Sequence, residues 1–170
     1  MMMRCFFQFC FVATLLAIGA CAQVAPPPTL AEITFAHLSP YQLAVRGVEV
    51  ESRFSSSMTP PHVELALTHP PERVLRRWAA DRLQATGGEA FARFIILDAT
   101  VTEFALETDG TLTAVFTNEQ ALRYEAAAEA LLEIRDATGG FLGNATARVT
   151  RTITIPENAT LNEREQVLFD

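Results

Sequence analysis

The chain has 170 residues, enough for one domain with a sizeable core, and its composition (49% hydrophobic) is ordinary for a folded protein. Its formal net charge is -7, and its 13 basic residues are all arginine. Because clustered basic residues supply the affinity for nucleic-acid phosphates and for anionic lipid surfaces, the acidic balance argues against nucleic-acid binding and against electrostatic docking on a membrane.

The first 20 residues have the pattern of an export signal. Arg4 is the only charged residue before Glu32, and an uncharged, mostly apolar run continues to Ala20. This run is shorter than the roughly 20 apolar residues of a membrane span. A basic start, an apolar centre and small residues at the cut are typical of a secretory signal peptide. The sequence therefore predicts a signal peptide over residues 1–20.

The end of this run, Ile18-Gly19-Ala20-Cys21, resembles a bacterial lipobox. In that class of signal the chain is cut before the cysteine, here after Ala20, and the Cys21 thiol and the new amino terminus are acylated. The resemblance implies a palmitate-type lipid anchor. Ala22 in place of Asp implies, by the sorting pattern of Gram-negative lipoproteins, the outer membrane and a periplasm-facing domain. The alternative is an ordinary signal peptide cut after Ala20 or Ala22.

Residues 21–31 are expected to form the acylated cysteine and a proline-rich tether. Pro26-Pro27-Pro28 favours the extended polyproline form, which rises about 3.1 Å per residue, so roughly ten residues would hold a domain about 30 Å from the headgroups. The chain has no cysteine after Cys21, which excludes disulfides and cysteine-based metal sites from the rest. We expect residues 32–170 to form a single domain.

The first elements of this domain are two strands and a helix. Strands are predicted over residues 33–38 and 43–54, the second with a β-bulge at Gly47, where the apolar residues change parity. Prolines 70 and 71 favour a helix start, and Gly87-Gly88 its end. Trp78 lies on the apolar stripe of this helix, so we interpret it as a core anchor rather than a ligand platform.

Three long strands are expected next. Residues 91–106 are apolar on both parities from 94 to 97, which predicts a central strand covered on both faces. A turn at 108–110 and a short return strand at 112–117 follow. Residues 122–136 combine high helix propensity with an unbroken period-two apolar pattern, and we predict a strand. A loop at 137–140 leads to a strand over 141–155.

The chain ends in a short predicted helix. Thr160 and Glu163 have the spacing of a capping box, but fewer than three turns follow. We expect residues 167–170 to be frayed and some apolar sheet surface to be uncovered. The predicted fold class is α+β: an antiparallel β-sheet with one amphipathic helix packed on a face, plus the short C-terminal helix.

No catalytic constellation, metal site or cofactor motif is evident. The three histidines are not spaced as metal ligands, and the acidic pairs Glu49/Glu51 and Glu129/Glu133 are interpreted as the solvated face of a sheet. Arg151 shares parity with apolar neighbours, so it either pairs with an acid such as Asp98, lines a groove or lies exposed at an edge. The position of any binding groove is left open.

Three stretches resemble an uncharacterised group of alphaproteobacterial lipoproteins: residues 72–83, 133–136 and 156–165. More loosely, the lipobox, tether and sheet-plus-helix domain resemble auxiliary lipoproteins of ABC-type lipid transport systems. These motifs indicate family membership but no chemistry. Because a sheet face or strand edge held at a fixed distance from the membrane suits docking to a partner, the leading hypothesis is a non-enzymatic envelope protein that binds another envelope protein as an interaction or assembly module. A transport accessory role is the alternative, and an envelope hydrolase, lacking a nucleophile and base, is a distant third.

Overall fold

The computed structural model describes residues 30–107 and 120–169, so Ala20, Cys21 and most of the predicted tether lie outside the described residues. The fold is α+β, with a mainly antiparallel sheet, as the sequence predicts. In chain order the elements are β1 (Tyr41–Leu43), β2 (Val48–Ser52), the short 3-10 helix η1 (Glu64–Ala66), α2 (Pro71–Arg82), β3 (Leu83–Ala85), β4 (Phe91–Ala105), β5 (Gln120–Arg135), β6 (Phe141–Pro156) and α3 (Leu161–Phe169).

The main sheet has the strand order β2-β4-β5-β6. β4, β5 and β6 pair antiparallel, whereas β2 pairs with β4 in parallel, which differs from the prediction of an antiparallel sheet. Parallel neighbours need a crossover connection, and here α2 lies within it. A second, two-stranded parallel sheet joins β1 to β3.

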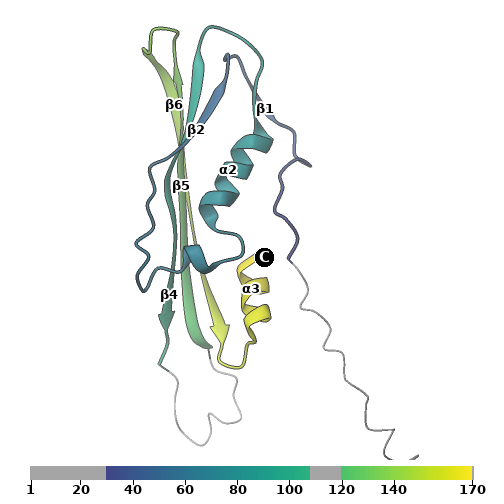
Figure 1. Ribbon diagram of the computed structural model, residues 1–170, viewed down its shortest axis with the longest axis vertical. Helices are drawn as coiled ribbons and strands as arrows, with labels where there is room; N and C mark the ends of the chain where they lie inside the picture. The colour runs from purple at the N-terminus through teal and green to yellow at the C-terminus, as the bar shows by residue number, and fades with distance from the viewer. Residues whose placement is uncertain (1–29, 108–119, 170) are drawn as a thin grey trace, which may run out of the picture.

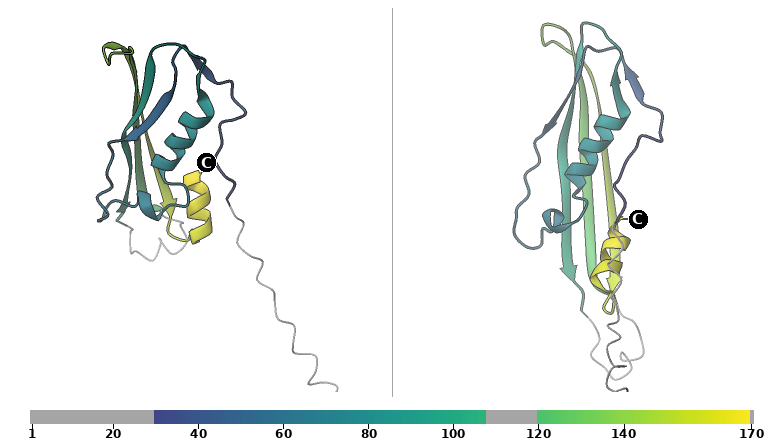
Figure 2. Two further views of the ribbon diagram at one scale, coloured as in Figure 1. Left: turned by 45° about the horizontal axis from the view of Figure 1, so that its top comes forward. Right: turned by 45° about the vertical axis from the view of Figure 1, so that its right-hand side comes forward.

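Both helices lie on the same side of the main sheet, α2 toward one end and α3 toward the other (Figures 1 and 2). α2 packs mainly on β4 and β2, and α3 contacts the end of β6. Two clusters of buried residues result. One lies under α2 around Phe94 and Ile96, and the other lies under α3 around Tyr124 and Ile155.

β5 is a strand despite its alanine-rich, helix-favouring composition, as the period-two pattern predicts. Its residues pair with β4 on one side and with β6 on the other. Tyr124 and Ala130 are buried on the helix-covered face, whereas Glu125, of the opposite parity, is exposed. Burial of one face between two neighbouring strands thus outweighs the local helix propensity.

β4 is the central strand expected from its continuous apolar run. Ile95 and Ile96 point to opposite faces, and both are fully buried. The pairing of β4 with β5 shifts register between Ile96 and Asp98, which moves the buried parity to Ala99 and Val101. This irregularity lets one strand serve both core clusters.

α2 begins where the prolines predict, with Pro71 in its first turn. It ends at Arg82 rather than at Gly87, so the predicted C-terminal boundary is wrong. The reason is that Leu83 turns to an extended conformation, and residues 83–85 pair with β1. Pairing with a second strand, which the sequence of the helix does not reveal, stops the helix a turn early.

The two strands predicted before α2 also differ from the structure. Residues 33–38 form no strand: a turn joins the Leu38 amide to the Phe35 carbonyl at 3.0 Å, and Asp81 of α2 accepts the Phe35 amide at 2.8 Å. Residues 43–54 are not one bulged strand, because Leu43 ends β1 in one sheet and Val48 begins β2 in the other.

Gly88 explains why the chain needs glycine between β3 and β4. Its φ is +132°, and a Cβ at this position would lie 2.7 Å from the Ala44 carbonyl oxygen. Gly87-Gly88 therefore permits a close backbone approach rather than ending a helix. The predicted loop at 137–140 is confirmed as the β5–β6 hairpin, whereas the predicted turn at 108–110 and strand at 112–117 lie outside the described residues.

α3 begins at the predicted capping box. The Glu163 carboxylate accepts the Thr160 amide at 2.8 Å, and the Thr160 hydroxyl lies 3.3 Å from the Glu163 amide. The expectation that the helix frays from residue 167 is wrong for residues 167–169, because α3 is helical to Phe169 and Leu168 packs against the second core cluster. Tertiary contacts stabilise a helix that is too short to be stable alone.

Candidate functional site: an apolar groove between α2 and the sheet

A groove of about 500 Å³ lies between α2 and the part of the sheet formed by β5 and β6. It forms because α2 covers β4 and β2 and leaves the neighbouring strands of the same face uncovered. This volume is within the range of small-molecule sites, roughly 300–1,000 Å³. The lining residues are mostly apolar: Tyr41, Leu43, Leu75, Trp78, Leu83, Phe94, Ala128, Ala130, Leu132, Ala145, Thr146, Ala147, Arg148 and Val149.

Alanines create the depth of the groove. In the β5–β6 register Ala130 lies beside Ala147, Ala128 beside Val149, and Leu132 beside Ala145, so these side chains share the face under the groove. A methyl group covers the backbone without filling the space above it. The small side chains on the floor and the large ones on α2 thus leave an apolar hollow.

Aromatic rings form the opposite wall. Trp78 of α2 stacks on Phe94 of β4, with ring centroids 5.5 Å apart, and lies 6.2 Å from Tyr41 of β1. The guanidinium of Arg82 lies over the outer ring, 4.8 Å from the Tyr41 centroid. Trp78 is half-buried and packs against the first core cluster, as predicted, but it also lines the groove, which the prediction did not include.

β6 borders the open side of the groove, and among the strands of residues 30–107 and 120–169 it is an edge strand of the main sheet. Most of its 16 residues are exposed, including Val149, which is 63% exposed. Edge strands of this length offer unpaired backbone groups to another strand. The groove and the free edge therefore meet along one strand.

The two arginines of β6 lie on opposite faces. Arg148 pairs with Glu129 at 2.6 Å and with Asp98 at 3.4 Å, so the possibility that Asp98 pairs with Arg151 is wrong. Arg151 lies opposite Ala126, on the face of the groove, and is exposed at the sheet edge. Among the described acids, none forms an ion pair with Arg151.

Glu64, in η1, is the one acidic side chain of the described residues that is buried, with 1% exposure. β2 ends alongside Ile96, and the loop before α2 covers the next part of the β4 edge. There the Glu64 carboxylate accepts the Val101 amide at 3.3 Å and the hydroxyl of Ser56. Glu64 thus supplies an acceptor to β4 where no strand does, which is a structural role.

The pKa of the Glu64 carboxyl reflects two opposed effects. Burial raises the pKa, but the hydrogen bonds from Ser56 and from backbone amides outweigh burial and hold the pKa below its ordinary value of 4.5. His62 Nδ1 lies 3.6 Å from the same carboxylate. Because the serine and the histidine both face the carboxylate rather than each other, the three groups do not have the order of a nucleophile–base–acid triad.

The two acidic pairs singled out in the sequence are engaged in ion pairs with arginines. Glu51 contacts Arg93 and Arg53, and Arg93 also lies 4.0 Å from Glu49, so the first acidic pair is neutralised on the polar face. In the second pair, Glu129 binds Arg148 and Glu133 binds Arg135. Within residues 30–107 and 120–169, no cluster of three or more His, Cys, Asp or Glu side chains is placed to hold a metal ion.

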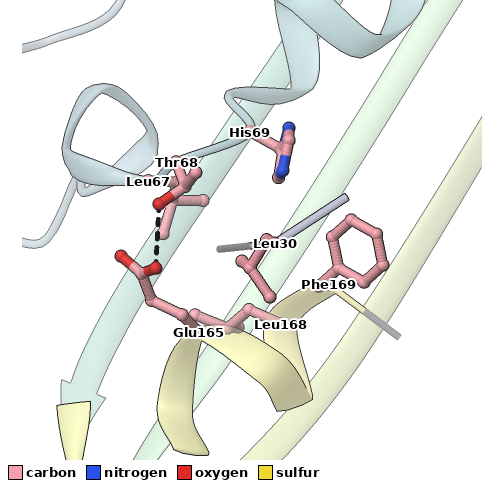
Figure 3. Close-up of a pocket in the computed structure, with 7 residues that line it drawn as sticks. All are labelled: Leu30, Leu67, Thr68, His69, Glu165, Leu168 and Phe169. Atoms are coloured by element: carbon pink, nitrogen blue, oxygen red, sulfur yellow. Dashed lines mark hydrogen bonds between the residues drawn. The ribbon is translucent and has the colours of Figure 1, made fainter. Parts of the chain in front are cut away.

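A second hollow lies where α3 meets the segment before α2 (Figure 3). It measures about 30 Å³, room for no more than a water molecule. Glu165 accepts the Thr68 hydroxyl at 2.8 Å, and the ring of Phe169 lies 5.3 Å from that of His69. These contacts dock α3 and leave no ligand site.

The groove could have been anticipated from one sequence signal. The inward parity of the 122–136 segment carries Ala126, Ala128 and Ala130, and the following strand carries Ala145 and Ala147. The parity identified these residues as buried or half-buried. Their small volume opposite a tryptophan was the signal that sequence reasoning missed.

Comparison with known proteins assigns no family. No family model matches the chain, and no curated protein matches it significantly. Among the described residues, no helix is long and apolar enough to cross a bilayer.

Proposed function

We propose that this chain is a lipid-anchored protein of the bacterial cell envelope, attached to the outer membrane through Cys21 and facing the periplasm. In this role it is a non-enzymatic interaction or assembly module. The lipobox-like segment and the proline-rich tether support the anchor. The groove and the exposed β6 edge support the binding role.

The observation that carries the binding role is the free edge of β6. A partner strand can add to such an edge through backbone hydrogen bonds, and its alternate side chains then lie on the face that holds the groove. The short length of β2 makes the opposite edge of the sheet a poorer template. The acidic composition favours a protein partner over nucleic acid.

Photocrosslinking in cells tests this role. A photoreactive amino acid at Val149, on the β6 edge, is expected to give a discrete crosslink to one envelope protein. Leu65 in η1 is the matched control. It is also an exposed aliphatic residue, with 56% of its surface accessible against 63% for Val149, but it lies away from the β6 edge. Equal crosslinking at both positions, or none at Val149, would contradict docking at this edge.

The second candidate is an auxiliary lipoprotein of an ABC-type lipid transport system. The apolar lining of the groove favours it, because an acyl chain needs an apolar, concave site. Lipid that co-purifies with the chain and is lost when Ala147 is enlarged would support this role.

A further inference from the structure

We propose that the groove holds the hydrocarbon chain of a long-chain fatty acid, whose carboxylate pairs with Arg151. This deepens the transport candidate by naming the ligand chemistry. The proposal rests on the groove and on Arg151, and it requires neither docking at the β6 edge nor lipidation.

The lining of the groove fits a hydrocarbon chain. The side chains of Leu75 and Trp78 from α2 lie across from a floor of alanines, Phe94 of β4 borders this floor, and the hollow opens along β6. A flexible alkyl chain has no hydrogen-bonding groups that need partners, so it suits walls that offer few. A peptide segment would bring backbone amides and carbonyls into the hollow, where the apolar walls leave them unsatisfied.

Arg151 supplies a cation at the end of the groove. It follows Val149 by two residues on the same face, and so lies about 7 Å further along the strand. The planar guanidinium forms paired hydrogen bonds with a carboxylate. Because Arg151 is exposed and has no ion pair among the described residues, its charge is available to a ligand.

The charges around Arg151 favour an anion. Residues 141–156 contain no acidic side chain. On the same face, Glu103 of β4 accepts the hydroxyl of Tyr124, whose β6 partner in register is Ile153. This carboxylate is therefore engaged two strands away from Arg151. A ligand with an apolar tail and a cationic head would meet like charge at the end of the groove.

The only tryptophan in the chain reports on the groove. We would titrate the full chain, in uncharged maltoside micelles, with stearic acid that carries a nitroxide quencher on its chain, and follow Trp78 fluorescence. The methyl ester of the same probe keeps the tail and removes the charge. We expect half-quenching by the acid at about a fivefold lower concentration than by the ester, as one charge-assisted contact predicts.

Two variants test the headgroup contact. Arg151→Gln is expected to reduce the preference for the acid to about twofold or less. Arg123→Gln removes the same charge from the neighbouring strand β5, on the opposite face and outside the lining of the groove, so it is expected to keep the wild-type preference. Equal quenching by acid and ester in the wild type, or a preference that survives Arg151→Gln, would overturn the proposal.

Two further variants test the tail. Ala147→Phe fills the groove from an exposed position and is expected to weaken quenching by both probes, whereas Thr150→Phe adds the same ring to the opposite face and is expected to have no effect. Thermal melts are the check that both variants are folded, and each is expected to unfold in one cooperative transition. Unchanged quenching in Ala147→Phe would place the tail elsewhere and overturn the site. These measurements use purified protein, so their failure leaves the crosslinking test of edge docking intact.

Discussion

Trp78 combines two demands that usually fall on different residues. Its ring packs on Phe94 at the margin of the first core cluster, yet it leaves enough surface free to line the groove. A side chain that supports the fold and also faces a hollow limits how much the hollow can change without loss of stability. Glu64, by contrast, has a structural role alone: its buried carboxylate accepts hydrogen bonds from Ser56 and Val101 within the fold.

Replacement of Trp78 by alanine is expected to lower the free energy of unfolding by about 3 kcal/mol, the lower end for a large core residue, because the ring is only half-buried. Thermal and denaturant melts measure this loss. Tyr41→Ala is the control, since Tyr41 also lines the groove but is 54% exposed, and about 1 kcal/mol or less is expected. A loss within error at Trp78 would contradict its core role.

Glu64→Gln is expected to destabilise the protein by about 1–2 kcal/mol at neutral pH, because the carboxylate accepts the Val101 amide and the Ser56 hydroxyl in a buried site. The folded-state pKa lies below the ordinary 4.5, so this stabilisation is present above pH 4.5 and is lost as the pH falls through the folded-state pKa. Denaturant melts of both proteins from pH 7 downward should show the difference narrowing below pH 4.5. A difference in the free energy of unfolding that stays constant with pH would contradict the stabilising role of the ionised Glu64 carboxylate.

At the scale of elements, α3 shows how a short helix is stabilised by its surroundings. Its capping box satisfies the first turn, and its last turn carries Leu168 into the second core cluster. Leu161, in the first turn, is 77% exposed. The same side chain is therefore exposed in the first turn of α3 and packed against the core in the last turn.

Leu168→Ala is expected to cost about 2 kcal/mol, because it removes apolar contacts from the cluster around Ile155. Leu161→Ala makes the same chemical change on the exposed side and is expected to stay within about 0.5 kcal/mol of the wild type. Parallel thermal melts compare the two. Equal losses would mean that α3 contributes through its helicity rather than through docking.

The long strands could be predicted because each carries its own evidence. The alternation of apolar and polar residues in β5 shows that one face of the strand is buried, and the continuous apolar run in β4 shows that both faces are. In each case the pattern lies within the segment's own sequence. β1, β3 and the end of α2 could not be predicted in this way. Leu83–Ala85 reads as a continuation of the helix, and only its pairing with Tyr41–Leu43, a partner distant in sequence, makes it a strand.

The candidate site was predicted less well than the fold. The parity placed Arg151 on an apolar face, and the structure confirms that place. The groove itself depends on where α2 sits across the sheet, and a helix that lay over β5 would have filled it. That offset is set by packing between α2, β2 and β4, which no single segment encodes.

At the scale of the whole molecule, the proposed anchor at Cys21 would place the groove at the surface of the outer membrane. Cys21→Ser is expected to abolish incorporation of labelled palmitate and to move the protein from the detergent phase to the aqueous phase, or to leave it unprocessed, because the acylated thiol is lost. Phase partitioning with radiolabelled palmitate measures both effects. Wild-type protein that partitions into the aqueous phase without label would contradict the anchor.

β6 belongs at once to the wall of the groove and to the edge of the sheet. A strand that pairs with this edge would alter the freedom of Ala145, Ala147 and Val149, the same residues that a molecule in the groove would touch. Thermodynamic linkage then requires reciprocity: the factor by which one occupant changes the affinity for the other is the same in both directions. Through β6 alone, binding of a ligand in the groove would thereby be coupled to binding of a partner protein at the sheet edge.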